Sequence, residues 1–364
     1  MAVLLLAGCA GSGEEGGKLD YAALDELEYS LVTEIGESED YLPGQISALA
    51  IDSRGHILAW DRPKVTIEQF DHEGNHLATV ATEGNGPGEV VQNTRLVGVP
   101  GDTLVLNFVQ ANQYSLFAPG DDGVYAFLEA TNHENPHSGS MNVQGSQSTD
   151  RHFLTTTSLD ITRLGPEGPA YSRQHVDLVD RTHAIIRDSL HEMILPNPII
   201  EMAGGGFTVY AGVPYDYQDV LQVFDDSSYL IARADSATLE YYSPDHEMQQ
   251  MVELNLVERP LTEADRAYAF RNMDREVQEK MLPRLAETKP AFLGLWASEE
   301  YIWMHTDNSG EGREMVVLTH QGEPLGRFIL AESERVHAVV GNRLYVVDND
   351  SDRGSVIRIY EVDL

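Results

Sequence analysis

One pattern of apolar and polar positions recurs along the chain. In its clearest copy, an apolar run at 46–51 and an Asp-Ser-Arg-Gly turn precede three segments of alternating character at 56–61, 65–70 and 75–80. Alternation with a period of two between turn residues predicts a four-stranded antiparallel sheet. Five further copies follow, the second of these being the least regular, and they begin near Arg95, Met141, Val220, Ala291 and Val336.

Six such units in one chain predict an all-β fold, a six-bladed β-propeller. A lone sheet of this kind has faces that it can bury only against neighbouring sheets, and a ring buries them all. The last copy supplies only three strands before Leu364, whereas the alternating segment 28–35 precedes the first copy. We expect 28–35 to complete the last blade and protect its edge. Residues 28–364 then form a single domain.

The connections between the predicted strands differ in length according to their place in the repeat. Turns between first and second strands, and between third and fourth strands, are short. The long segments lie between blades or between second and third strands, at 129–139, 157–172, 190–219 and 255–290. In a propeller these two classes emerge on one face. Insertions gathered on one face of a repeat protein usually mark its binding face, and the alternative is tolerated length.

The longest of these segments contains a predicted helix. Thr262 provides an N-cap with Asp265 three residues later, and apolar residues follow at helical spacing as far as Leu285. Pro283 and Pro290 end the pattern. We therefore expect a helical insertion over about 262–286, which either covers apolar blade surface or forms a partial lid over the channel mouth.

The N-terminus carries a separate signal. A short apolar run ends in Leu6-Ala7-Gly8-Cys9, which resembles the signal peptide of bacterial lipoproteins. The resemblance implies that residues 1–9 direct export, that Cys9 carries lipid, and that residues 10–27 form a flexible tether. Ala10 after the cysteine favours, by the same resemblance, the outer membrane. Cys9 is the only cysteine, which excludes an intrachain disulfide and a cysteine-rich zinc site.

The charge balance is strongly acidic. The 364 residues include 59 Asp and Glu against 24 Lys and Arg, for a formal net charge of −35. Such a surface argues against nucleic acid and anionic head groups as partners. The acidic residues are spread along the chain, which is typical of a halophile's hydrated surface and not of a calcium-binding protein. No apolar stretch is long enough to predict a membrane-spanning helix.

The blade pattern, its Asp-rich turns and the segment Glu83-Gly-Asn-Gly-Pro-Gly-Glu89 together resemble a known group. They are similar to bacterial six-bladed β-propeller lipoproteins related to NHL-repeat proteins. The resemblance covers about residues 28–364, with Val90 where family members usually have an aromatic residue. It implies the propeller fold and an envelope location, and it implies no particular reaction.

Five polar residues end predicted second strands on the long-loop side: Asp61, Asn107, Arg233, His305 and Asp348. Pointing toward one axis, they would bind a polar ligand or a metal. By resemblance to gluconolactonase-type propellers, carboxylates and an amide would hold a divalent cation. The alternative is that these groups line a water-filled channel and satisfy one another. Trp303, in the strand that precedes His305, is expected to pack between blades.

A possible metal site lies near the C-terminus. Asp348, Asp350 and Asp352 alternate in a segment that is similar to an acidic calcium loop. Gly354 stands at its seventh position and Ile359 at its twelfth, which departs from the EF-hand pattern and favours a hairpin turn. Neither a His-Glu-x-x-His, a Gly-x-Ser-x-Gly nor a P-loop motif occurs. We predict no cofactor, with Ca²⁺ or another divalent cation as the alternative.

Together these features favour a monomeric, lipid-anchored envelope propeller. In this hypothesis it binds a protein, peptide or glycan on its long-loop face and catalyses no reaction. The second hypothesis is a metal-assisted hydrolase or lyase that acts in the central channel through Asp61, Asn107, His305 and Asp348. Carboxylates converging at about 2.3–2.6 Å on one cation would favour the enzyme, whereas scattered polar groups bonded to their neighbours would favour binding.

Overall fold

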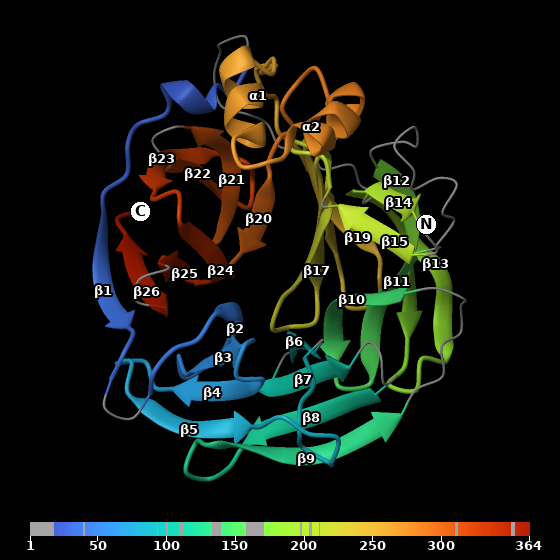
Figure 1. Ribbon diagram of the computed structural model, residues 1–364, viewed down its shortest axis with the longest axis vertical. Coiled ribbons are helices and arrows are strands. Elements are labelled where there is room, and N and C mark those ends of the chain that lie inside the picture. The colour runs from blue at the N-terminus through green and yellow to red at the C-terminus, as the bar shows by residue number, and fades with distance from the viewer. Residues whose placement is uncertain are drawn as a thin grey trace.

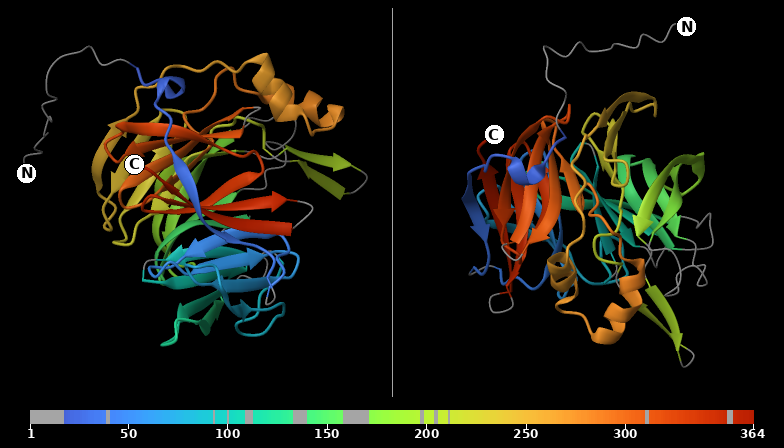
Figure 2. Two further views of the ribbon diagram at one scale, coloured as in Figure 1. Left: turned by 90° about the vertical axis from the view of Figure 1, so that its left-hand side faces the viewer. Right: turned by 90° about the horizontal axis from the view of Figure 1, so that it is seen from above.

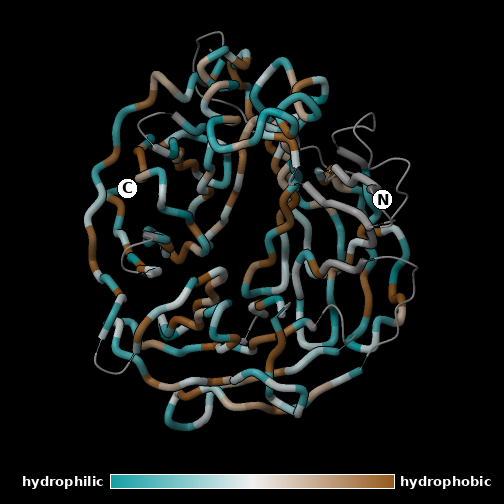
Figure 3. The backbone as a smooth tube through the Cα atoms, viewed as in Figure 1, coloured by the Kyte–Doolittle hydropathy of each residue, from teal (hydrophilic) through white to brown (hydrophobic). Residues whose placement is uncertain are grey.

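The computed structural model describes residues 18–38, 41–92, 94–99, 101–108, 113–132, 140–157, 171–196, 199–203, 206–210, 212–309, 312–350 and 354–364. Its strands form six four-stranded antiparallel sheets arranged as blades around a ring (Figure 1). The predicted six-bladed β-propeller is therefore confirmed. Hydrophobic stretches run through the blade strands, whereas much of the helical insertion is hydrophilic (Figure 3).

The strands of the first five blades pair in chain order. Blades one and two consist of β2 (Ile46–Ile51), β3 (Ile57–Asp61), β4 (Thr66–Phe70) and β5 (His76–Ala81), then β6 (Thr94–Val99), β7 (Thr103–Phe108), β8 (Gln113–Pro119) and β9 (Tyr125–Asn132). Blade three consists of β10 (Ser140–Ser148), β11 (Arg151–Thr157), β12 (Tyr171–Val179) and β13 (Ile185–Pro196). A separate hairpin follows, β14 (Ile199–Ala203) and β15 (Gly206–Tyr210).

The second half of the ring repeats this order. Blade four consists of β16 (Val220–Val223), β17 (Tyr229–Arg233), β18 (Thr238–Tyr242) and β19 (Met248–Glu253). Blade five consists of β20 (Gly294–Ala297), β21 (Tyr301–Ser309), β22 (Gly312–Thr319) and β23 (Pro324–Leu330). Blade six has only β24 (Glu334–Val340), β25 (Arg343–Asp350) and β26 (Gly354–Val362) from this end of the chain.

The N-terminal strand β1 (Tyr29–Ile35) completes blade six, as predicted. It pairs antiparallel with β26, with Tyr29 opposite Val362 and Ile35 opposite Ile357. The strand thus covers the edge that three C-terminal strands would leave open, and the two ends of the chain share one sheet.

The hydrophobic core lies between adjacent blades. Each of the six contacts between blades has its own buried cluster, because side chains alternate across a strand and both faces of a blade meet a neighbour. All five residues of β3 are buried in consequence. Trp303 is fully buried in the cluster between blades five and six, together with Val346. Its predicted place between blades is confirmed.

The helical insertion contains two helices. The capping box of Thr262 and Asp265 begins α1 (Glu263–Phe270) as predicted, but the expectation of one continuous helix is wrong. The chain turns, and α2 (Arg275–Met281) and the 3-10 helix η2 (Leu282–Arg284) follow. The turn lets Phe270 and Met281 share one buried cluster, whereas a straight helix would place them about 16 Å apart along its axis.

The segment before β1 also belongs to the fold. Backbone hydrogen bonds of 2.6 and 2.9 Å join Leu19 to Asn255 and Val257. Tyr21 begins the 3-10 helix η1 (Tyr21–Ala23) and is 2% exposed within the cluster between blades four and five. The expectation that all of 10–27 forms a tether is therefore wrong from residue 18 onward, since a large aromatic is buried there. Cys9 and residues 10–17 lie outside the described residues.

Candidate functional site

The strand directions divide the propeller into two faces. Ile46 pairs with Asp61, and Glu334 with Asp348, so each first strand starts beside the end of its second strand. The side where these ends meet is the long-loop face, from which α2 and the β14–β15 hairpin project (Figure 2). The opposite side, which carries the tight turns between first and second strands, is the short-turn face. The predicted asymmetry of loop length is present in the described residues.

Of the five polar residues predicted to end second strands, Asp61 and Arg233 do so, whereas the strands continue past Asn107, His305 and Asp348. All five point into the contacts between blades. Ile57 and Ala59 pack against Val347 of blade six, so Asp61, on the same side of β3, faces that blade as well. No hydrogen bond or ion pair between described residues joins any two of the five. By the same alternation, Arg233 and Asp348 face the preceding blade. Asn107 and His305 face the following blade.

Asp61 holds the crossing from blade six into blade one. Its fully buried carboxylate accepts hydrogen bonds from the Tyr41 hydroxyl and the Gly44 N–H, both at 2.8 Å, and from the Gln45 N–H at 3.2 Å. Lys64 lies 3.6 Å from it. A Cβ at Gly44 would lie 2.3 Å from a carboxylate oxygen, so only glycine allows this approach. Asp61 is therefore occupied by its own blade crossing.

Arg233 makes the equivalent crossing at blade four. It donates to Asp219 at 3.0 Å and forms an ion pair with Glu240 at 2.8 Å. Asp219 also accepts the backbone N–H groups of Ile194 and Ala234, at 2.8 and 3.1 Å. Burial raises the pKa of Asp219, while these hydrogen bonds and Arg233 oppose the increase. A buried carboxylate with this many donors anchors the chain, and few of its acceptor positions remain for a ligand.

The strands on either side of the acidic segment near the C-terminus form a hairpin, which is the interpretation that the sequence favoured. Asp350 of β25 pairs with Gly354 of β26. Arg358 donates to the Asp348 carboxylate at 2.6 Å. This guanidinium group occupies the carboxylate that would have to be free to bind calcium. The side chain of Asp350 and all of Asp352 lie outside the described residues. No group of three or more His, Cys, Asp or Glu in the described part of the chain could hold a metal ion.

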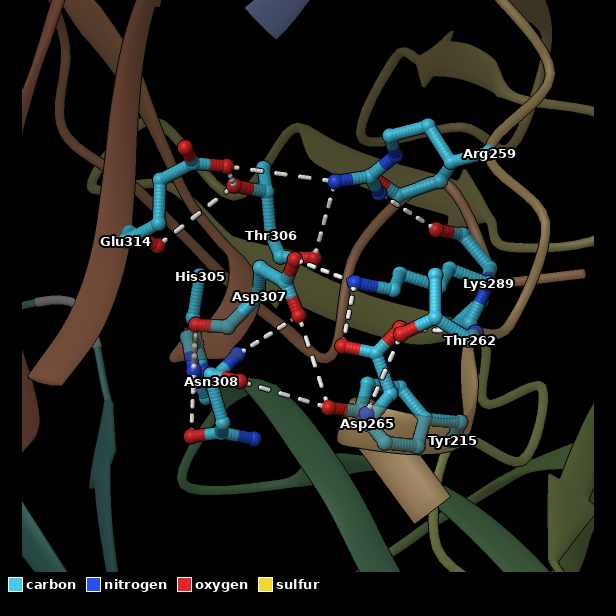
Figure 4. A network of polar contacts seen from close by, with 12 residues as sticks. Tyr215, Arg259, Thr262, Asp265, Lys289, His305, Thr306, Asp307, Asn308 and Glu314 are labelled. Atoms are coloured by element: carbon cyan, nitrogen blue, oxygen red, sulfur yellow. Dashed lines mark hydrogen bonds and ion pairs between the residues drawn. The ribbon is translucent and has the colours of Figure 1, made fainter. Parts of the chain in front are cut away.

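His305 lies near the helical insertion and is neutral (Figure 4). Its Nε2 contacts the Asp307 carbonyl at 3.0 Å and the Asn308 side-chain oxygen at 3.1 Å. Burial lowers the pKa of His305 to about 4, and the charge of Arg313 adds to this. Asn107 lies in a different blade and is 2% exposed, and its Oδ1 has no hydrogen-bond partner among the described residues.

Lys289 joins the helical insertion to blade five (Figure 4). Its ammonium group donates to Asp265 of α1 at 2.8 Å and to Asp307 of β21 at 2.5 Å. The Lys289 side chain is only 9% exposed. Tyr215, from the chain that enters blade four, contacts Asp307 at 3.4 Å. The insertion is thereby fixed over the end of blade five on the long-loop face.

Each face of the propeller has a cavity beside the ends of first strands, and we call these two cavities the short-turn mouth and the long-loop mouth. On the short-turn face, a cavity of about 660 Å³ is lined by turns from five blades and includes Asp52, Asp102, Asp225, Glu299 and Glu300. On the long-loop face, a cavity of about 680 Å³ lies between the inner strands of blades one and two and reaches blade three. Both volumes fall in the range of small-molecule sites. The two mouths differ in charge, because the second contains arginines and no acidic residue.

Arg62 and Arg95 are the charged residues of the long-loop cavity. Sequence reasoning missed both, because a single arginine beside a strand belongs to no motif. A signal was present in the repeat, since copies two and six both carry arginine near the start of the first strand, as Arg95 and Arg335. The structure thus indicates a cavity lined by Arg62 and Arg95, and not the five strand-end residues, as the candidate binding site.

The fold is shared with solved structures of low sequence identity. A candidate exported protein of Bacteroides fragilis superposes with a TM-score of 0.56 at 10% identity, over 95% of this chain and 98% of that one. A member of the DUF4221 family from Bacteroides vulgatus gives 0.52 at 12% identity, over 93% and 99%. No family model and no curated protein matches the chain. At these identities the likeness establishes the fold alone, and the resemblance to NHL-related lipoproteins stays a prediction.

Proposed function

We propose that this chain is an exported, lipid-anchored propeller that binds a protein, peptide or glycan on its long-loop face without catalysing a reaction. The observation that carries the proposal is that the helical insertion forms a fixed surface there. Lys289 ties it to blade five through two carboxylates. At its neck, Leu261 and Glu287 are joined by a backbone hydrogen bond of 2.8 Å, as are Lys289 and Arg259. Binding surfaces of repeat proteins are commonly built from such insertions.

The first described residues lie beside the root of the insertion. The Arg259 guanidinium group lies over the Tyr21 ring at 4.9 Å and donates to the Pro290 carbonyl at 2.8 Å. Eight residues lie between Cys9 and Lys18, so the chain that joins them spans at most about 30 Å when extended. A lipid on Cys9 would therefore hold the propeller close to the membrane surface. The Bacteroides fragilis protein of the same fold is itself a candidate exported protein.

The described residues do not favour the metal-assisted hydrolase or lyase. Asp61 and Asp348 each bind partners in their own part of the ring. His305 lies in another blade, bonded to neighbours in its own strand. Convergence on one atom, which metal-assisted hydrolysis requires, is absent for these three residues.

Excision of the insertion tests the proposed binding face. Residues 262–286 are replaced by Asn-Gly, because Leu261 and Glu287 are already hydrogen-bonded across the neck and a two-residue hairpin can join them. The lipidated full chain and this variant are compared for capture of partners from a native envelope extract. We expect the excised protein to remain folded by thermal melting and to lose the captured partner.

The matched control changes the opposite mouth. Glu299→Gln with Glu300→Gln alters charge on the short-turn face and leaves the insertion intact. We expect this variant to capture the same partner as the unaltered chain. Equal capture by the excised protein, or loss of capture in the control alone, would overturn the proposal.

A further inference from the structure

Two arginines at the long-loop mouth have no side-chain partner among the residues that the structure describes. Arg62 follows β3 directly, and Arg95 is the second residue of β6. Both are exposed and line the cavity of about 680 Å³. In the part of the chain that the structure describes, no hydrogen bond or ion pair engages either guanidinium group. In contrast, Arg233 at the end of β17 binds two carboxylates, and Arg358 in the middle of β26 binds three.

Arg95 is exposed at the cavity but partly desolvated by the surrounding protein. Burial lowers the pKa of Arg95, with no charged neighbour to offset the loss of hydration. Asn107 lies directly opposite Arg95 on β7. Its side-chain oxygen is buried and has no hydrogen-bond partner among the described residues. Arg95, which lines the cavity, thus lies opposite a buried acceptor group, and among the described residues neither has a side-chain partner.

A third unpaired arginine extends the positive charge to the next blade. Arg335 is the second residue of β24, is exposed, and forms no ion pair with a described residue. Its strand and β6 both pack beside β2, so the arginines lie on three consecutive blades. His337, two residues further along β24, has its pKa lowered to about 4 by burial and by the charge of Arg335. Arg335 therefore adds a third exposed guanidinium group on this face, in a chain whose net charge is −35.

Such a grouping is unfavourable unless an anion completes it. The chain has 59 acidic residues, yet no described carboxylate is placed beside these guanidinium groups. A guanidinium group presents a fork of N–H donors that matches carboxylate and phosphate oxygens. The cavity also offers the hydroxyl of Ser47 and the amide of Gln92, beside apolar Leu96 and Val143. Hydroxyl and amide groups around a charged fork suit a polar, hydroxylated ligand.

We propose that Arg62 and Arg95 bind the anionic group of a sugar, a carboxylate or a phosphate, in this cavity. Ser47 and Gln92, which line the same cavity, contact hydroxyl groups of the ligand. Arg335 strengthens the local potential without touching the ligand. The inference rests on the proposed function and names the ligand class of the same face: an acidic glycan.

Titration calorimetry on the full chain tests the inference with three probes. Glucuronate carries a carboxylate, glucose 6-phosphate carries a phosphate, and glucose carries no charge. We expect one charged sugar to bind in the millimolar range or tighter, and glucose to bind at least tenfold more weakly, a difference of about 1.4 kcal/mol. The better charged probe identifies the anionic group. Absence of binding by both charged sugars, or equal binding of glucose, would overturn the inference.

Variants assign the binding to the cavity. Arg62→Gln and Arg95→Gln should each weaken binding of the charged sugar about tenfold, because each removes a charge-assisted contact. Arg151→Gln is the matched control, since Arg151 is also exposed but starts the second strand of blade three, on the short-turn face. We expect it to change affinity less than twofold. An equal loss in this control would mean that only the overall charge matters, which contradicts the inference.

The outcome is distinguishable from failure of the proposed function. Arginine variants that bind no differently, while excision of 262–286 still abolishes envelope capture, would overturn the anionic-sugar site alone. Arginine-dependent sugar binding with capture unaffected by the excision would instead contradict the role of the insertion in binding.

Discussion

At the scale of single residues, the charged side chains near the ends of second strands join segments of the chain through hydrogen bonds and ion pairs. Asp61 holds the crossing into blade one, and Arg233 joins Asp219 at the entry to blade four. Arg358 binds both Asp348 and Glu34, which lie on either side of β26. Buried charges are costly unless they are paired. The ion pairs and hydrogen bonds of the fold therefore account for the charge of these residues.

Lys289→Met should destabilise the protein by about 3 kcal/mol, because it leaves Asp265 and Asp307 facing each other without their shared cation. Burial acts to raise the pKa of Asp265, but hydrogen bonds from Lys289 and Thr262 outweigh this and hold it below its usual value. Denaturant unfolding measures the loss. Arg275→Met, which breaks an exposed pair with Glu279, should cost less than about 1 kcal/mol. Equal losses would contradict a special role for Lys289.

His191→Gln should make stability less sensitive to acid. Burial, reinforced by the charge of Arg233, lowers the pKa of His191 to about 4, whereas an unfolded histidine titrates near 6.5. Between these values the unfolded chain binds a proton that the folded chain does not, so stability falls as the pH drops from about 6.5 to about 4. Removing the group should reduce this slope by up to about 1.4 kcal/mol per pH unit.

Unfolding free energies measured across this pH range test the effect. His72→Gln is the control, since His72 is exposed, and we expect it to leave the slope unchanged. A slope in the His191→Gln protein equal to that of the unaltered chain would show that His191 does not carry the acid sensitivity.

Cys9→Ser should release the protein from the membrane fraction of the expressing cell, because the cysteine follows Leu-Ala-Gly as a lipid acceptor does. Fractionation followed by detection of the chain measures this. Unchanged sedimentation with membranes would rule out lipid at Cys9 as the anchor.

At the scale of elements, ring closure depends on a strand from the opposite end of the chain. β1 pairs with β26 along its length, and Tyr29 and Tyr360 stack edge to face at 5.2 Å. The segment before β1 adds Tyr21 to the core between blades four and five. The contact between blades four and five and the closure of blade six therefore both depend on one N-terminal segment, and we expect its loss to affect the whole propeller.

Truncation of residues 1–37 should lower the melting temperature and promote association. It exposes the backbone N–H and C=O groups of β26 as a free edge, and such edges recruit other strands. Calorimetry and light scattering measure the two effects. Addition of a separate peptide covering 18–37 should reverse both. A truncated protein that melts as the full chain does would disprove closure by β1.

At the scale of the whole molecule, charge is distributed unevenly over an acidic protein. Acidic residues line the short-turn mouth, whereas Arg62 and Arg95 line the long-loop mouth. The rest of the surface follows the composition, with 59 acids and 24 basic residues. Mutual repulsion among so many carboxylates opposes the compact state. No helix in the described residues is long and apolar enough to cross a membrane.

Stability should therefore rise with NaCl concentration. The Debye length falls from about 10 Å at 0.1 M to about 3 Å at 1 M salt, which screens the repulsion. Melting curves at increasing NaCl measure the effect, and EDTA should change them little. Melting that responds strongly to EDTA and not to NaCl would show that a bound cation explains the acidity, because tight sites saturate at low concentration.

The sequence by itself determined the features that depend on local order along the chain. Period-two alternation between turn residues predicted the blades, and the missing strand of the last copy predicted the role of β1. Thr262 and Asp265 predicted where α1 begins, because a capping box needs only neighbouring residues.

Only the tertiary structure decided where side chains point and what they meet. Asp61 and Asn107 both lie near the ends of second strands, yet they face different neighbouring blades, because one step along a strand reverses direction. The helical break before Arg275 and the burial of Tyr21 follow from packing against residues far away in the sequence. Arg62 and Arg95 also line one cavity only because the blades that carry them pack together. Local periodicity cannot predict such contacts, since the ring alone brings these residues together.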